Sequence, residues 1–349
     1  MTKAIEHLAL YRKYRPASFR DVLGQDHVVK VLEGAIKLEN ISHAYLFAGS
    51  RGTGKTSVAR IFAKEIGTSS NDLYEIDAAS NRGIDDVRQL REAVNTMPFE
   101  SKYKVYIIDE VHMLTKEAFN ALLKTLEEPP KHVIFILATT EMEKLPETII
   151  SRCQTFAFKK PSHEVLKELV IAVAKKEGFT LEPASGDLIA LLADGSFRDA
   201  QGILQKVISG SKDKKISLGE VETVTGAPRE KLLNSILEAV DKSDLSSALS
   251  EIGKASDAGV DMKVLLALLT QKTRQVLLLR YSKDSEKRIS EETPKETFEL
   301  LKSISQNNKS PVSSKLLLEF LQSNDLIGFS PVPELPIELA LMKILGQNQ

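Results

Sequence analysis

The segment that most constrains the fold of this chain matches the pattern G-x-x-x-x-G-K-[ST]. It consists of Gly49, Ser50, Arg51, Gly52, Thr53, Gly54, Lys55 and Thr56. Glycines at these positions allow positive φ angles, so that successive backbone N–H groups can point at phosphate oxygens. Lys55 then supplies a positive charge for the β- and γ-phosphates, and the Thr56 hydroxyl can bind Mg²⁺. The segment therefore predicts a phosphate-binding loop.

The residues on either side of this loop suit it. Ala44–Ala48 is a short apolar run typical of a buried strand, and residues 57–66 have the spacing of a helix with one apolar face. A strand, the loop and a helix are the arrangement that phosphate binding requires, because the N-terminus of the helix adds a positive dipole. We therefore expect a nucleotide at this position.

Composition excludes several other classes of protein. The 349 residues are enough for two or three domains, and the net charge of −1 argues against binding nucleic acid through bulk charge. Apolar runs such as 133–138 are too short to cross a bilayer, and the N-terminus has no signal sequence. One cysteine and six scattered histidines offer neither a disulfide framework nor a local metal motif. We expect a cytoplasmic protein with no membrane partner.

The first half of the chain alternates between strand and helix patterns. The expected strands after the loop are 73–76, 104–108, 133–137 and 155–158, and the expected helices between them are 85–95 and 116–127. Alternation of this kind predicts an α/β domain with a central parallel sheet covered by helices.

After Pro161 the strand-like runs vanish and helical patterns replace them. The expected helices are 164–177, 183–193, 198–209, 262–281 and 335–345, with a break at 225–228. These patterns predict three domains: an α/β P-loop domain at 1–160, a small helical lid at 161–226 and an all-α domain at 227–349.

A second candidate element of the site follows the apolar run that ends at Ile108. Asp109 and Glu110 come directly after it, about fifty residues beyond the loop. An Asp at the carboxyl end of a strand beside a phosphate-binding loop is placed to organise Mg²⁺, and the adjacent Glu is placed to polarise a water molecule. The pair is a weak signal alone and a strong one together with the loop.

Several longer segments resemble one family. Residues 109–114 (Asp-Glu-Val-His-Met-Leu) and 119–130 resemble AAA+ clamp-loader ATPases, and residues 75–83 and 11–16 resemble the DNA polymerase III gamma/tau family more narrowly. The resemblance covers about residues 8–225, and the remainder fits a helical collar of plausible length. It implies an AAA+ fold with a lid and a collar through which subunits associate.

The resemblance also implies roles for single residues. Lys55 and Thr56 would act on the phosphates and Mg²⁺, Asp109 on the metal, and Glu110 as the catalytic base. Thr140 would sense the γ-phosphate, Arg152 in Ser151-Arg152-Cys153 would reach the ATP of a neighbouring subunit, and Arg198 would report the nucleotide to the lid. Tyr11 and Arg12 belong to the segment that would lie against the adenine.

Each of these roles has a simpler alternative. Arg152 and Arg198 could be solvated surface arginines, Thr140 could only end a strand, and segment 11–16 could be a plain N-terminal arm. Cys153 is expected to pack as a small hydrophobic residue rather than to react. Asn81 and Arg82 are candidates for contact with DNA phosphates.

In one respect the sequence departs from the family. Gamma/tau subunits commonly have a four-cysteine zinc module between the P-loop helix and the next strand, whereas residues 66–72 contain no cysteine. Zinc needs thiolate or imidazole ligands at close spacing, so we expect no zinc. The chain also ends near the collar and so resembles a gamma-length form without the longer tau-type tail.

The function implied is that of the ATP-hydrolysing motor subunit of a clamp loader in DNA replication. Its cofactors would be ATP and Mg²⁺. Its partners would be delta, delta-prime and further gamma copies in a hetero-pentameric ring, together with a sliding clamp and primer–template DNA held through its backbone. By family naming, such a subunit would belong to the DNA polymerase III holoenzyme, which is a nucleotidyltransferase.

Two alternatives remain open at this point. A branch-migration helicase motor would share the fold, but such motors usually end in a DNA-binding domain rather than a collar. An inert or ATP-locked scaffold subunit would not need Lys55, Asp109, Glu110 and Arg152 together. A Glu110→Gln variant that binds ATP but no longer hydrolyses it would favour the motor.

Overall fold

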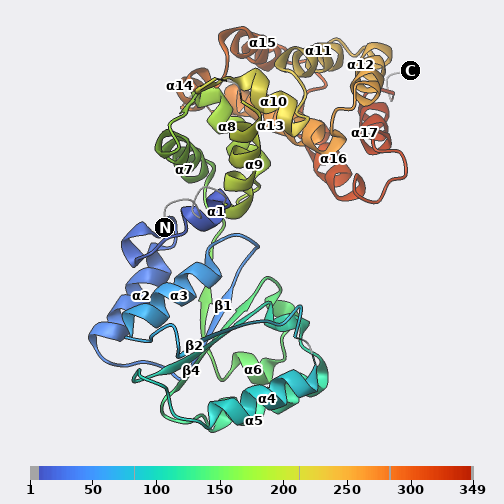
Figure 1. Ribbon diagram of the computed structural model, residues 1–349. Helices are drawn as coiled ribbons and strands as arrows, with labels where there is room; N and C mark the ends of the chain where they lie inside the picture. Colours follow the sequence, from blue (N-terminus) through green and yellow to red (C-terminus); the bar gives the residue numbers. More distant parts are fainter. Residues whose placement is uncertain (1–7, 82, 212, 283, 347–349) are drawn as a thin grey trace. The chain divides into compact units, whose positions relative to one another are not determined.

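The computed structural model describes residues 8–81, 83–211, 213–282 and 284–346 (Figure 1). By its internal contacts the chain separates into two compact units. The first joins the chain up to Val173 with Ala193–Gln205, and the second joins Ala174–Leu192 with the chain from Lys206 onward.

A five-stranded sheet forms the centre of the first unit. Its strands are β1 (Ala44–Ala48), β2 (Leu73–Asp77), β3 (Lys104–Asp109), β4 (Val133–Thr139) and β5 (Gln154–Ala157). They lie in the order β2-β3-β4-β1-β5, and all neighbours are parallel. The expected parallel sheet is confirmed, with β5 one residue earlier than predicted. Because every strand runs the same way, the ends of β1, β3 and β4 meet at one edge of the sheet.

Helices cover both faces of this sheet (Figure 1). On one face lie α2 (Asp26–Lys37) and α3 (Lys55–Glu65), and on the other lie α4 (Ile84–Val94), α5 (Lys116–Glu127) and α6 (Glu147–Ile150). Alternate residues of β1 point to opposite faces, so Phe47 packs with the α2–α3 side and Leu46 with the α4–α5 side. Both faces are therefore buried, which is why the strands are continuous apolar runs.

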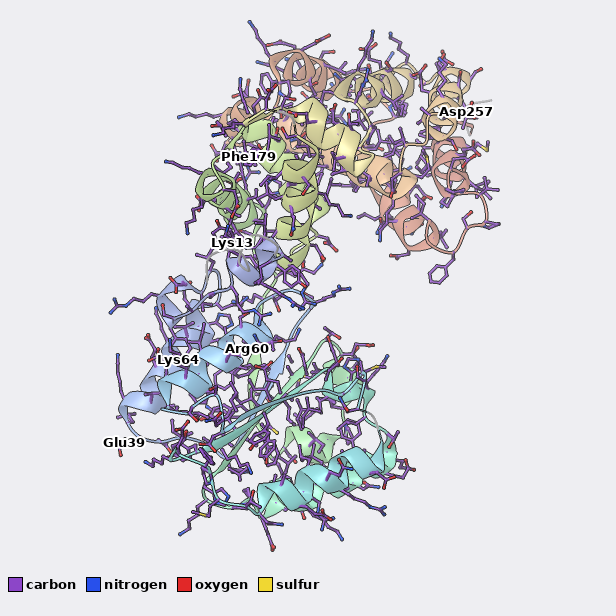
Figure 2. All side chains as sticks on the ribbon, in the orientation of Figure 1. Lys13, Glu39, Arg60, Lys64, Phe179 and Asp257 are labelled. Carbon is purple, nitrogen blue, oxygen red and sulfur yellow. The ribbon has the colours of Figure 1, made fainter. Side chains whose placement is uncertain are left out.

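Side chains fill the space between the sheet and its helices (Figure 2). Arg60 and Lys64 lie on α3, and Arg60 makes an ion pair with Glu75 of β2. Shorter elements of this unit are α1 (Leu10–Lys13) and three single turns, η1 (Phe19–Asp21), η2 (Val111–Met113) and η3 (Met142–Lys144). The turns η2 and η3 follow β3 and β4 directly and so shape the sheet edge at which those strands end.

The described chain after β5 is helical except for one short pair of strands. The first helices are α7 (His163–Lys176), α8 (Pro183–Leu192), α9 (Phe197–Gly210) and α10 (Leu218–Thr225). The prediction that strands vanish after Pro161 was wrong, because β6 (Thr180–Leu181) and β7 (Lys215–Ile216) form a parallel pair. Only Leu181 and Ile216 of the four residues are buried, and a two-residue strand is too short to show a period.

The rest of the second unit is helical. Its elements are α11 (Glu230–Asp241), α12 (Leu245–Asp257), α13 (Met262–Tyr281), α14 (Ser285–Glu292), α15 (Lys295–Gln306), α16 (Ser314–Leu326) and α17 (Leu335–Leu345). The long helix α13 packs against α11, α15 and α16. Near its end the Arg280 guanidinium donates to four backbone oxygens of residues 304–312, at 3.0 to 3.3 Å. No helix within the described ranges has the length and apolar character needed to cross a membrane.

Candidate nucleotide-binding site

The phosphate-binding segment forms a tight loop between β1 and α3. Gly49, Gly52 and Gly54 have φ angles of 156°, 73° and 100°, values that other residues rarely adopt. Helix α3 begins at Lys55, two residues earlier than predicted, directly after the left-handed Gly54. The hydroxyl of Ser50 is buried without a hydrogen-bond partner among the described residues. A curled backbone, a helix N-terminus and an unsatisfied hydroxyl together fit a bound phosphate.

Lys55 lies inside this loop and is only 6% exposed. Its Nζ donates to the backbone oxygens of Gly49 (2.8 Å) and Ser50 (3.0 Å). Burial lowers the pKa of Lys55, while the negative charges of Glu110 and Asp109 act in the opposite direction. A buried ammonium group close to two carboxylates can exchange its carbonyl partners for phosphate oxygens.

Thr56 and Asp109 join the two predicted elements of the site. The Thr56 Oγ1 donates to Asp109 Oδ2 over 2.8 Å, although the residues are 53 positions apart. Asp109 is the last residue of β3, and β4 lies between β3 and β1. Hydroxyl and carboxylate oxygens are the ligands that Mg²⁺ prefers. The donor set therefore fits this metal.

Glu110 follows in an unusual backbone conformation. Its φ is 50°, in the left-handed region that is uncommon for residues other than glycine. Its Oε2 accepts hydrogen bonds from the backbone N (3.2 Å) and the Oγ1 (2.9 Å) of Thr140. The predicted base and the predicted γ-phosphate sensor are thus in direct contact. Thr140 itself lies one residue beyond β4.

Residues of the N-terminal segment and of α9 also meet within the first unit. The Arg198 guanidinium lies 5.4 Å from the centre of the Tyr11 ring, and that of Arg12 lies 5.8 Å from the same ring. The backbone N of Phe197 donates to Gly52 O over 3.0 Å, so the start of α9 contacts the phosphate-binding loop. The positive charge of Arg198 also acts to lower the pKa of Lys55.

Arg152 makes its contacts elsewhere. Its guanidinium donates to Thr148 O (2.7 Å) and to Glu127 Oε1 (2.6 Å), and these partners belong to α6 and α5 rather than to the phosphate-binding loop. The neighbouring Cys153 packs against the core on the α4–α5 side, and burial raises the pKa of its thiol to about 12. A thiol of this kind is inert, as expected from the sequence.

Two polar residues of the site belong to no motif that the sequence reveals. Gln25 is fully buried: its Nε2 donates to Lys159 O (2.7 Å), and its Oε1 accepts from Lys159 N (3.1 Å). It thereby ties the start of α2 to the chain that follows β5. The second residue is His112, which lies on η2 and faces Glu110. The segment 109–114, on which the family resemblance partly rests, contains His112, but nothing in its pattern assigns this side chain a contact.

The candidate DNA-contact residues fall in the loop after β2. Asn81 is exposed, and its Nδ2 donates to Asp77 O over 3.0 Å. Arg82 lies outside the described residues. The loop is attached to the site because the backbone N of Ala78 donates to Asp109 O over 2.9 Å.

Comparisons with known proteins agree with this arrangement. A family model for the DNA polymerase III delta subunit matches residues 24–81 and 67–162, and a model for domain III of DNA polymerase III subunits gamma and tau matches 216–348. The chain is similar in fold to the RuvB Holliday junction branch migration motor of Thermotoga maritima. The TM-score is 0.53 at 23% identity, over 69% of this chain and 85% of that one. Both comparisons agree with an α/β domain followed by helical domains.

Among curated proteins, DNA polymerase III subunit tau of Bacillus subtilis is 37% identical over 97% of this chain and 63% of its own length. Subunit tau of Escherichia coli is 38% identical over 80% of this chain and 46% of its own length. The chain thus spans about half to two thirds of the length of these relatives. Because 37% identity extends over 97% of the chain and the domain III model matches residues 216–348, the chain belongs to the DNA polymerase III gamma/tau family.

Proposed function

We propose that this chain is an ATP-hydrolysing motor subunit of a clamp loader, which opens a sliding clamp and loads it onto primed DNA during replication. The observation that carries the proposal is the 2.8 Å hydrogen bond between Thr56 and Asp109. It brings the phosphate-binding loop and the acid pair into one site in a chain of the gamma/tau family.

The loop and the first acid would bind the nucleotide. Gly49, Ser50, Arg51, Gly52, Thr53, Gly54, Lys55 and Thr56 form the phosphate-binding segment. Lys55 would leave its carbonyl partners for the β- and γ-phosphates, and Thr56 and Asp109 would hold Mg²⁺. The chemistry that Mg²⁺ supplies when bound is neutralisation of charge on these phosphates.

Glu110 would act as the base that orients and polarises the attacking water. Both hydrogen bonds from Thr140 fall on its Oε2. Oε1 has no hydrogen-bond donor among the residues that the structure describes, so it is the oxygen that can accept a proton from water. If Thr140 turns to the γ-phosphate, Glu110 loses this partner when nucleotide binds.

Two arginines would complete the site in different ways. Arg152 would reach the ATP of the neighbouring subunit, where a guanidinium at the γ-phosphate is worth roughly 10³–10⁵ in rate. Its present partner, Glu127, would have to release it or move with it. Arg198, next to Tyr11, would report the nucleotide to a lid at 161–226, and Tyr11 and Arg12 would lie near the adenine.

The assembly would be a hetero-pentameric ring in the cytoplasm, associated with the replisome on the nucleoid. Its other members would be delta, delta-prime and further gamma copies, joined through a collar at 227–349. The ring would hold primer–template DNA by backbone contacts, since loading must not depend on sequence. The nucleotidyltransferase name would belong to the polymerase holoenzyme, whereas the site described here is suited to ATP hydrolysis.

The domain III match favours a clamp loader over a branch-migration motor, because it covers the C-terminal region in which the two would differ. An inert scaffold subunit is less well supported. The site contains Lys55, Thr56, Asp109 and Glu110 with intact contacts, and nucleotide binding without hydrolysis would not require Glu110.

The test compares the wild-type chain with Glu110→Gln, assembled with its partner subunits. We expect Glu110→Gln to bind ATP with a Kd within about threefold of wild type and to hydrolyse it at least about 100-fold more slowly. Glu117→Gln is a matched control, because Glu117 is exposed on the first turn of α5. Failure of the wild-type chain to bind ATP would refute the proposal.

A further inference from the structure

His112 occupies a buried position between two carboxylates. Its side chain is 5% exposed, and it lies on η2 directly after Glu110. The Nδ1 is 3.4 Å from Glu110 Oε2, and the Nε2 is 3.2 Å from Glu141 Oε1. Both ring nitrogens are thus in contact with acidic residues at the edge of the sheet where β3 and β4 end.

The same ring reaches the end of β4. Nδ1 lies 3.0 Å from the Oγ1 of Thr139, a residue with no exposed surface. Thr139 Oγ1 also accepts from the backbone N of Glu141 over 3.0 Å. His112 is therefore connected to both ends of the turn that contains Thr140.

Glu141 is itself fixed from its other side. Lys144 of η3 contacts Glu141 Oε2 over 2.6 Å, while Oε1 faces the imidazole. The ring is thus bounded by a buried hydroxyl and by a carboxylate with its own partner. An imidazole in these surroundings has little freedom to rotate.

Glu110 needs such support for two reasons. Its left-handed φ of 50° is a conformation that persists only where the surrounding structure enforces it. The hydrogen bonds that its carboxylate accepts come from Thr140, which under the proposed function turns to the γ-phosphate. Among the residues that the structure describes, His112 would then be the side chain left facing Glu110 Oε2.

We propose that His112 is a positioning residue, which holds the Glu110 carboxylate through Nδ1 and keeps it in register with the turn 139–141. The inference rests on the proposed ATPase function and adds a residue to it. ATP binding depends on Lys55, Thr56 and the loop, so loss of His112 affects turnover and leaves nucleotide affinity unchanged. A displacement of about 1 Å at a reacting group can cost on the order of 100-fold in rate.

Two amide substitutions separate the two ring nitrogens. The side-chain nitrogen of Asn can take the place of Nδ1, and that of Gln can take the place of Nε2. We expect His112→Ala and His112→Gln to lower kcat about 10- to 100-fold, with the ATP Kd within about twofold of wild type. His112→Asn is expected to retain most of the turnover, because it keeps a donor toward Glu110 and Thr139.

The measurements are steady-state hydrolysis and ATP binding by the chain assembled with partner subunits, sliding clamp and primed DNA. His132→Asn is the matched control. Unlike His112, it contacts backbone oxygens, Val94 O (3.2 Å) and Thr96 O (3.1 Å), and it precedes β4 at the opposite edge of the sheet. It should leave both kcat and Kd unchanged.

The outcomes distinguish this inference from the proposed function. If His112→Ala and His112→Gln turn over ATP at the wild-type rate, His112 positions nothing and the ATPase proposal stands. If His112→Ala does not fold, His112→Gln equal to or faster than His112→Asn overturns the inference. If the wild-type assembly binds ATP and does not hydrolyse it, both proposals fail.

Discussion

Replacement of Gly52 by alanine is a direct test of the contact between the phosphate-binding loop and α9. A Cβ at this position would lie 2.0 Å from the Oγ and 2.9 Å from the Cβ of Ser196. The hydroxyl could rotate away, but the Ser196 Cβ is fixed to the backbone. Ser196 therefore has to move, and with it the 3.0 Å hydrogen bond from Phe197 N to Gly52 O at the start of α9.

The expected loss of stability has two parts. Gly52 has a φ of 73°, so any side chain costs about 1–2 kcal/mol in backbone strain. Displacing packed neighbours adds about 1–3 kcal/mol. Gly52→Ala should therefore lower the free energy of unfolding of the first unit by about 2–5 kcal/mol. Gly54→Ala is the matched control, because Gly54 has a φ of 100° and nothing within 4 Å, so only the strain of about 1–2 kcal/mol applies.

The assay is urea unfolding followed by circular dichroism, with hydrogen exchange of β1 and β4 amides to assign the transition of the first unit. A double-mutant cycle with Ser196→Gly isolates the contact. Ser196→Gly alone loses the hydrogen bond from Asp199 N to its hydroxyl, and in the Gly52→Ala background it also relieves the clash. Equal losses for Gly52→Ala and Gly54→Ala, or a coupling energy near zero, would refute the reasoning.

Three further predictions concern other parts of the chain. Burial raises the pKa of Asp72, but hydrogen bonds from the backbone of residues 99–101 lower it more, to about 2. Wild type should therefore be more stable than Asp72→Asn by about 2 kcal/mol in urea unfolding above pH 4, and this advantage should disappear between about pH 4 and 2. A stability difference that stays constant over this range would contradict the prediction. Arg280→Lys loses the forked donors to four backbone oxygens and should destabilise the second unit by about 2–3 kcal/mol in the same assay, whereas a change below about 0.5 kcal/mol would show that the fork is dispensable. One face of α17 exposes apolar side chains at helical spacing: Leu335 (37% exposed), Leu339 (52%) and Met342 (41%). Leu339→Glu should therefore weaken assembly with partner subunits at least about tenfold, as measured by sedimentation, and leave the circular dichroism spectrum unchanged. Unaltered assembly would show that this face of α17 does not contact the partner subunits.

The sequence predicted best those elements that have both a strong period and a clear boundary. Helix α5 begins and ends as predicted, because Thr115 caps it by accepting from Ala118 N and Pro129 prevents its continuation. The same is true of α13, which begins after the capping side chain of Asp261. The pair β6–β7 was missed because its pairing joins residues 35 positions apart and its strands contain two residues each.

The residues of the site likewise divide into those that the sequence predicted and those that it did not. Lys55, Thr56, Asp109 and Glu110 could be placed from motifs, since fixed spacing and strand ends determine where those side chains lie. The roles of Gln25 and His112 could not. Each is a single polar residue with no periodic pattern, and each acquires its meaning from partners 134 and 27 positions away. Contacts of this kind depend on how the strands are ordered in the sheet, which single-sequence patterns do not specify.

The central claim is that this chain hydrolyses ATP as part of a ring in which Arg152 acts on the neighbour. It is tested most directly by ATP hydrolysis with and without primed DNA plus sliding clamp, in the presence of the partner subunits, for wild type and Arg152→Ala. The account predicts stimulation in the wild type and its loss, by roughly 10³-fold or more, in Arg152→Ala, which should still bind ATP. Equal stimulation in both would contradict the role of Arg152, and bound ATP without turnover in the wild type would favour an inert scaffold subunit.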